Sequence, residues 1–273
     1  FSINQFKKKL FEQKKEFRNI CKMKLVVQPQ FIDQKKDIET LLTHFNEQGA
    51  LLVKGSRNTI KIFPLNDQLL NIKAFKKPNL LNSFVYRFIR DSKAKRSYNY
   101  ALRLLNSDIG TPQPIAFAEY TDGIGLGKSF YVCEHIVTEY TYRDLVQNPD
   151  LENHEEILRA FTVFCYKLHE AGVEFKDHSP GNTLIKINSD NSYSFYLVDL
   201  NRMKFHTQMS FEQRMYNLRR LTPKKEMIAI MANEYAKLYT QKSEQEIFNL
   251  LWNLTSEFQM KFHRKQKLKK RYK

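Results

Sequence analysis

Asp177 and Asn182 are two residues whose side-chain types and spacing suit a shared chemical role. They lie in the segment Phe-Lys-Asp-His-Ser-Pro-Gly-Asn, residues 175–182. A carboxylate can take a proton from a substrate hydroxyl as a general base, and an amide oxygen is a suitable ligand for a hard cation such as Mg²⁺. The Pro-Gly pair before the Asn predicts a turn that brings the amide back toward the carboxylate. The same spacing is common in ordinary loops, so the pair indicates a function only in a suitable context.

Asp199 supplies that context. It ends the apolar run Tyr-Leu-Val-Asp, residues 196–199, in the second strand of a hairpin predicted over residues 183–200. Kinases use this order of a catalytic Asp, a metal-binding Asn and a metal-binding Asp at a strand end. The pattern therefore predicts phosphoryl transfer from ATP, with Asp177 as the base and with Asn182 and Asp199 as Mg²⁺ ligands. The structural alternative is that Asp199 only caps a strand and Asp177 only caps a turn.

Lys73 is the predicted phosphate-binding and catalytic lysine. It lies in Asn-Ile-Lys-Ala-Phe, residues 71–75, which predicts a third strand after a hairpin and before a helix, the place of the lysine in the kinase motif V-A-I-K. The hairpin turn at residues 54–58 is expected to cover the phosphates with its backbone amides. The nucleotide-binding residues predicted in this turn are Lys54, Gly55 and Arg57.

A glycine-rich segment at residues 122–129, Asp-Gly-Ile-Gly-Leu-Gly-Lys-Ser, resembles a phosphate-binding P-loop but has Asp where the first glycine of that motif belongs. A P-loop must lead into a helix whose amino terminus holds the phosphate. The strand-like Ser-Phe-Tyr-Val-Cys-Glu-His-Ile follows instead, so a hairpin turn is predicted here.

The periodicity of the chain predicts an α+β, two-lobed, protein-kinase-like fold. Three strands at residues 48–75, a helix near 92–105 and two strands near 114–136 predict a small antiparallel-sheet lobe with one main helix. A helix over residues 155–172, the hairpin, and helices beginning at Pro223 and at Ser243 predict a larger helical lobe. The predicted divisions are a basic extension (1–36), the nucleotide-binding lobe (37–137), the catalytic lobe (138–260) and a basic tail (261–273).

The charge of the chain is concentrated at its ends. Residues 1–24 and 261–273 together carry +14 of the net charge of +16. Such ends are more typical of solubilising extensions or of anchors to anionic membranes than of a nucleic-acid-binding surface, so no nucleic-acid partner is expected. Met23 would be a natural start, and residues 1–22 are expected to contribute little to the fold. Three scattered cysteines fit neither a disulfide framework nor a zinc site and favour a reducing cytoplasm.

At these motifs the chain resembles the bacterial lipopolysaccharide kinase family of Kdo and heptose core kinases, which are related to protein kinases. The resemblance spans roughly residues 49–221 and is most specific at FKDHSPGNTLI, YLVDLNRMKF and SKAKRSYNYALRLLNSDIGTPQPIAFAE. It implies transfer of the ATP γ-phosphate, with magnesium, to a hydroxyl of an inner-core sugar on lipid A, with a Kdo-type sugar as the expected acceptor, at the cytoplasmic face of the inner membrane. It also implies that the hinge from Glu134 to Ile136 meets adenine.

The resemblance has one important departure. Such kinases pair the strand lysine with a helix glutamate, and the matching position here is Asn99, with no acid anywhere in residues 92–107. Asn99 is therefore the predicted neutral partner of Lys73. Two alternatives remain open at this stage: a kinase of another small molecule or of a protein, and a pseudokinase that binds a partner without turnover.

Overall fold

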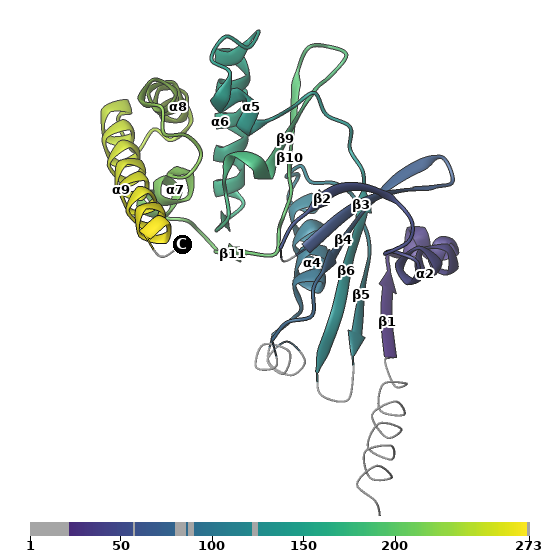
Figure 1. Cartoon of the computed structure of the whole chain (residues 1–273). Coiled ribbons are helices and arrows are strands. Elements are labelled where there is room, and N and C mark those ends of the chain that lie inside the picture. Colours follow the sequence, from purple (N-terminus) through teal and green to yellow (C-terminus); the bar gives the residue numbers. More distant parts are fainter. Residues whose placement is uncertain (1–21, 57, 80–85, 87–89, 122–124, 272–273) are drawn as a thin grey trace, which may run out of the picture. The chain divides into compact units, whose positions relative to one another are not determined.

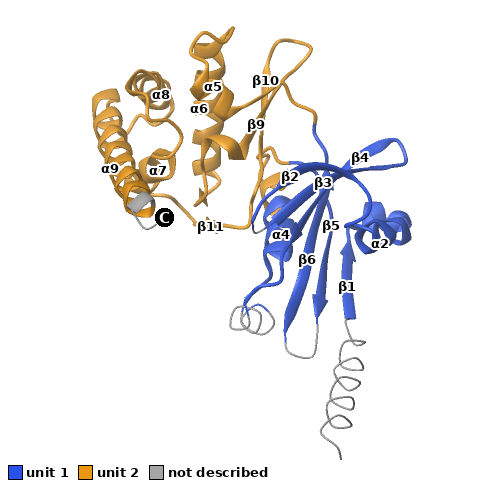
Figure 2. Ribbon diagram, viewed as in Figure 1, with its two compact units in different colours: residues 1–102, 112–136 blue, residues 103–111, 137–273 orange. Residues whose placement is uncertain are grey.

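The computed structural model describes residues 22–271 except 57, 80–85, 87–89 and 122–124 (Figure 1). The chain divides into two compact units, which Figure 2 shows in different colours. Unit 1 comprises residues 1–102 and 112–136, and unit 2 comprises residues 103–111 and 137–273. As predicted, the fold is α+β, with an antiparallel sheet in the first unit and a mostly helical second unit.

Unit 1 is built on a six-stranded sheet of order β1-β5-β6-β4-β3-β2, in which every neighbouring pair is antiparallel. Its strands are β1 (Lys22–Val27), β2 (Ala50–Lys54), β3 (Asn58–Leu65), β4 (Gln68–Phe75), β5 (Pro114–Thr121) and β6 (Leu126–Glu134). The predicted sequence of three strands, a helix and two strands is confirmed for β2 to β6. Lys128 and Ser129 lie within β6, so the segment that resembles a P-loop leads into a strand and not into a helix.

The two faces of this sheet are covered by different helices. One face packs against α2 (Lys35–Thr43), which follows the short helix η1 (Pro29–Gln34), and Ile38, Leu42 and the nearby Phe45 join its core. The other face meets α4 (Lys93–Leu105), where the ring centroids of Tyr98 and Phe117 lie 5.2 Å apart. Phe117 pairs with Tyr131 and Tyr131 with Lys73 across the strands, and paired residues share a face. Lys73 therefore lies on the face that α4 covers.

Strand β1 was missed by the sequence analysis, which assigned residues 1–36 to a basic extension, and no helix was predicted at the position of α2. β1 pairs with β5 along its whole length, from Lys22 opposite Thr121 to Val27 opposite Ala116. Its Met23, Leu25 and Val27 pack against the sheet core. Lys-Met-Lys-Leu has the period of two of a half-buried strand, but the lysines gave it the composition of a solvated end. In the described residues the sheet of unit 1 thus begins at Lys22 and not after residue 36.

The described residues of unit 2 form five α-helices and several short strands. Its helices are α5 (Tyr142–Gln147), α6 (His154–Glu170), α7 (Phe211–Leu218), α8 (Lys225–Leu238) and α9 (Glu244–Arg271), with one turn of 3₁₀ helix, η2 (Pro180–Asn182). One small sheet has the order β10-β9-β7, and a second pairs β11 with β8. The strands are β7 (Tyr140–Thr141), β8 (Val173–Phe175), β9 (Thr183–Ile187), β10 (Tyr193–Leu197) and β11 (Met203–Phe205). The predicted hairpin is β9–β10.

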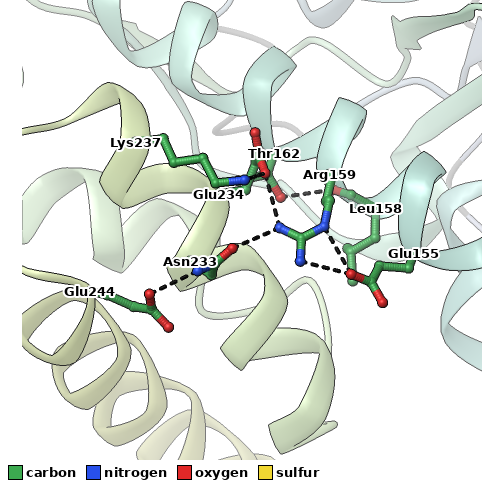
Figure 3. A network of polar contacts seen from close by, with 8 residues as sticks. All are labelled: Glu155, Leu158, Arg159, Thr162, Asn233, Glu234, Lys237 and Glu244. Carbon is green, nitrogen blue, oxygen red and sulfur yellow. Dashed lines mark hydrogen bonds and ion pairs between the residues drawn. The ribbon is translucent and has the colours of Figure 1, made fainter.

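Helices α6, α8 and α9 are joined by a polar network around Arg159 (Figure 3). Arg159 of α6 donates to Glu155 of the same helix at 2.7 Å and to Glu234 and Asn233 of α8 at 3.0 and 2.8 Å. Asn233 then donates to Glu244, the first residue of α9, at 2.8 Å. The buried side chains of the three helices belong to one apolar core. Ile185 and Phe195, from two strands of unit 2, join the same core.

The helix ends follow the predictions in part. The Ser243–Glu246 capping box is confirmed, with Ser243 N donating to Glu246 at 2.9 Å and Glu246 N to Ser243 Oγ at 3.3 Å. Pro223 is not the first helical residue, because Thr222 Oγ1 accepts the Lys224 amide and α8 begins only at Lys225. Helix α9 continues unbroken to Arg271 through the residues predicted to form a tail. None of the helices among the described residues combines the length and the apolarity that a membrane span requires.

Candidate active site

Two pairs of strands in unit 2 hold the predicted catalytic segments side by side. β8 pairs with β11 through Phe175 and Met203, and β9 pairs with β10 through Thr183 and Leu197. Residues 176–182 and residues 198–202 are the two links between these pairs, so they run next to each other. Two backbone hydrogen bonds cross between them, from Lys176 N to Arg202 O and from Val198 N to Asn182 O, both 3.0 Å long. The structure thus brings Asp177, Asn182 and Asp199 together within unit 2, as the sequence predicted.

Asn182 is oriented by its own loop. Its Nδ2 donates to the backbone oxygen of Asp177 at 2.8 Å, and its backbone amide donates to Ser179 at 2.9 Å. Because the amide nitrogen is fixed in this way, the Oδ1 atom is the part of the side chain left to accept from a ligand. That is the orientation expected of a metal ligand.

Asp199 has a backbone that non-glycine residues seldom adopt, with φ at +59°. Such left-handed conformations cost of order 1 kcal/mol or more and cluster at functional sites. Asn201, which is almost fully buried, donates from Nδ2 to Asp199 Oδ1 at 2.6 Å and fixes the carboxylate. The strained backbone and the hydrogen bond from Asn201 thus hold the Asp199 carboxylate in one orientation at the end of the strand pair. This is the position at which the sequence predicted a metal ligand.

The donor set fits a Mg²⁺ ion that also binds phosphate. Asp199 and Asn182 offer one carboxylate and one amide oxygen, and Mg²⁺ is usually held by one or two carboxylates together with substrate phosphates and water. Within the described ranges, no cluster of three or more His, Cys, Asp or Glu side chains is placed to hold a metal. A metal at this position would therefore depend on nucleotide oxygens for much of its coordination.

Asp177 accepts from two arginines that the sequence analysis did not single out. Its Oδ1 lies 3.2 Å from Arg202 Nη1 and 3.3 Å from Arg220 Nη1. Arg220 also donates to the backbone oxygen of Lys176 at 3.0 Å. No spacing rule could have found Arg220, because it lies 43 residues from Asp177. For Arg202 the sequence did offer a local clue, because this residue lies in the segment Asp-Leu-Asn-Arg that begins with Asp199.

His178, next to the predicted base, is a structural residue. It is fully buried and its ring stacks on Phe175 at 5.5 Å and meets the edge of Phe161 at 5.9 Å. Burial lowers the pKa of His178 to about 4. The pKa of the buried His169 is lowered to about 3, by burial first and by His178 second. Both rings are therefore neutral near pH 7, and Asp177 remains the candidate base of this loop.

Lys73 occupies the interior of the sheet in unit 1. It is 7% exposed and pairs with Ile60 on one side and Tyr131 on the other. Its ammonium lies 5.5 Å from the ring centroid of Phe75, a distance that suits a cation–π contact. A strand lysine that is only solvated would be exposed, so its burial agrees with the predicted role, which itself remains a prediction.

Asn99, the predicted partner of Lys73, is exposed on α4. Its neighbours Ser97, Tyr98 and Ala101 are buried instead. In an α-helix, consecutive residues differ in direction by about 100°, and the buried residues define the side turned toward the sheet. The burial pattern therefore does not favour Asn99 as the residue that holds Lys73.

The other residues predicted to bind the nucleotide lie in two places in unit 1, the turn between β2 and β3 and the hinge at the end of β6. Lys54 is exposed at the end of β2, and the amide of Gly55 donates to Asn58 O at 2.9 Å, so this amide serves the turn and not a phosphate. Arg57 lies outside the described residues. In the hinge, Glu134 N and His135 N donate to Gln113 and Leu69. The amide of Ile136 has no acceptor in the described part of the chain, which leaves it able to bind an adenine ring.

Comparison with known families decides the identity. The model of the lipopolysaccharide kinase (Kdo/WaaP) family matches residues 79–241, which is more than half of the chain. The chain belongs to this family. It is therefore a kinase-type phosphotransferase of lipopolysaccharide synthesis that uses ATP. The match covers both segments that are predicted to be catalytic and most of unit 2, and it ends a few residues after α8.

Comparison with solved structures found the following similarities. The structure of WaaP in complex with acyl carrier protein is similar with a TM-score of 0.59 and 15% identity, over 88% of this chain and 98% of that chain. A Stt7 homolog from Micromonas algae soaked with ATP is similar with a TM-score of 0.40 and 15% identity, over 56% of this chain and 48% of that one. None of the curated protein sequences matches this chain. At 15% identity the similarity to WaaP supports the predicted kinase-like fold of this chain, and it assigns no role to any residue.

Proposed function

We propose that this kinase transfers the γ-phosphoryl group of ATP, with Mg²⁺, to a hydroxyl of an inner-core sugar on lipid A, with a Kdo-type sugar as the acceptor. The observation that carries the proposal is the meeting of Asp177, Asn182 and Asp199 on two adjoining segments in a chain of the lipopolysaccharide kinase family. Family membership gives the reaction class, and the acceptor sugar is the part that is inferred.

In this mechanism the acceptor hydroxyl donates its proton to Asp177. Oδ1 of Asp177 already accepts from two guanidinium groups, so Oδ2 is the oxygen proposed to take the proton. Asn182 and Asp199 would hold the metal, which neutralises charge on the transferred phosphoryl group. Lys73 is proposed to bind the α- and β-phosphates, and the free amide of Ile136 to bind adenine.

The deciding experiment measures ATP consumption with and without a Kdo-bearing lipid A precursor. We expect consumption to rise on addition of the precursor and one phosphoryl group to appear on the sugar. A kinase of another small molecule or of a protein would consume ATP only with its own acceptor. A pseudokinase, which the absence of an acidic residue from α4 would favour, would bind ATP and transfer nothing to any acceptor.

We also propose that α9 holds the kinase at the cytoplasmic face of the anionic inner membrane. From Lys261 to Lys269 every residue of the helix is exposed, and Met260, Phe262 and Leu268 are exposed apolar side chains among the basic ones. Basic residues near an anionic surface contribute roughly 1 kcal/mol each. This segment is the carboxy-terminal continuation of a helix whose first half packs on the core of unit 2.

Removal of residues 262–273 is expected to lower binding to vesicles that contain anionic lipid by at least about tenfold, and added salt should have the same effect on the full chain. The measurement is co-sedimentation with anionic and with neutral vesicles at low and high salt. A matched control replaces Lys237 and Lys242 by Gln, which removes one cation from an ion pair within α8 and one from an ion pair between the turn before α9 and Glu246 in the first turn of α9. Unchanged binding after truncation would show that the helix end only aids solubility.

A further inference from the structure

The predicted catalytic base is held by two arginines that have capacity for a second anion. In the described part of the chain, Asp177 is the only carboxylate bonded to either Arg202 or Arg220. Both contacts reach the same oxygen, Oδ1, and each uses only one nitrogen of its guanidinium group. A guanidinium group carries five N–H donors in a planar fork that suits carboxylate and phosphate. Most donors of Arg202 are thus uncommitted.

The two arginines differ in how firmly they are held. Arg220 is anchored, since it donates to Lys176 O at 3.0 Å and its guanidinium carbon lies 5.5 Å from the ring centroid of Phe258. Its Nε is buried and has no partner among the described atoms. The side chain of Arg202 is 59% exposed, whereas that of Asp177 is 23% exposed. Arg202 can therefore turn toward a ligand at little cost, because ion pairs at such exposure contribute about 0–1 kcal/mol.

A further cation lies against the same loop. A Cβ atom on Gly181 would collide with the guanidinium group of Arg143, which is exposed at the start of α5. Lys176 and Lys204, on either side of the paired segments, are exposed as well. The acid nearest in sequence, Glu174, is already bonded to His206 at 2.8 Å. The loop around Asp177 is therefore rich in cations, and Asp199 is the carboxylate that lies on the neighbouring segment.

We infer that Arg202 and Arg220 form a subsite for an oxyanion of the acceptor, a carboxylate or a phosphate next to the hydroxyl that is phosphorylated. This inference rests on the proposed function. The acceptor anion takes guanidinium donors away from Asp177 Oδ1 as it binds. The arginines thereby position an acidic sugar over the base, and the carboxylate, with fewer guanidinium contacts on Oδ1, accepts a proton on Oδ2 more readily when such a sugar is present. Arg202, the exposed partner, determines the preference for an acidic acceptor.

The test is a binding measurement that needs no turnover. Titration calorimetry of the full chain compares the methyl glycoside of Kdo with its neutral carboxamide, and a heptose phosphate with the same heptose lacking phosphate. Charge-assisted hydrogen bonds are strong enough for us to expect at least about a tenfold preference for the acidic member of one pair. Preference in the first pair identifies a carboxylate subsite, and preference in the second identifies a phosphate subsite.

The variants separate this inference from a general charge effect. Arg202→Gln should abolish the preference, whereas Arg202→Lys, which keeps the charge without the fork, should retain part of it. Lys242→Gln removes one cation from a surface ion pair with Glu246 and should keep the full preference. Equal affinity of the parent for the members of both pairs, or an undiminished preference in Arg202→Gln, overturns the inference.

The same ligands distinguish this failure from a failure of the proposed function. If the parent phosphorylates the acid and the amide equally well, the sugar kinase stands and the anion subsite does not. If the parent binds acidic sugars selectively through Arg202 but phosphorylates none of them, the subsite stands and the proposed reaction does not.

Discussion

Replacement of Asp177 by Asn is expected to lower phosphoryl transfer by about 10²–10⁴-fold, the range for loss of a general base. Asn at this position can still accept from Arg202 and Arg220 through its Oδ1, so the loop should keep its shape. Asp199→Ala removes the carboxylate proposed to bind the metal and should cost at least as much. The measurement is kcat/KM with ATP and the Kdo-bearing acceptor, with folding checked by thermal unfolding.

The matched control is Asp150→Asn, which makes the same chemical change at an exposed residue between α5 and α6. Its turnover should equal that of the parent. Turnover close to that of the parent in folded Asp177→Asn or Asp199→Ala would refute the assignment of that residue.

Phe161→Ala is expected to lower the free energy of unfolding by about 3–5 kcal/mol, the usual cost of removing a buried Phe. Phe161 is fully buried in α6, and its ring lies 4.2 Å from that of Tyr142 and 5.5 Å from that of Phe195, centroid to centroid. It also contacts the His178 ring, 5.9 Å away, on the catalytic loop. The cavity would thus lie beneath the residues that flank Asp177, and turnover should fall at temperatures where the chain is still folded.

Urea unfolding of the variant and the parent measures this cost. Phe262→Ala removes the same side chain from an exposed position of α9, where it is 46% exposed. Surface substitutions usually change stability by no more than about 0.5 kcal/mol. A similar loss in both variants would show that the core around Phe161 does not support the catalytic loop.

The fold class was readable from the sequence because its local signals agree with one another. The hairpin β9–β10, the helix α6 and the capping box at Ser243 each have a short-range pattern, and the structure confirms all three. Where composition opposed periodicity, the sequence analysis failed. The lysines of β1 concealed an alternating strand, and Pro223 suggested a helix start that the bond from Lys224 to Thr222 delays by two residues.

The sequence by itself determined which side chains meet at the candidate site, since Asp177, Asn182 and Asp199 belong to motifs of fixed spacing, and their chemical roles stay predictions. The spacing was enough to predict this grouping because of two strand pairs. The pair β8–β11 holds one end of residues 176–182 next to one end of residues 198–202, and the pair β9–β10 holds their other ends together. Tertiary structure alone decided the environment of Asp177. Arg220 reaches it from 43 residues away, and no local pattern encodes a contact that depends on how distant segments pack. The same holds for Asn99, whose exposure is set by which side of α4 the sheet buries.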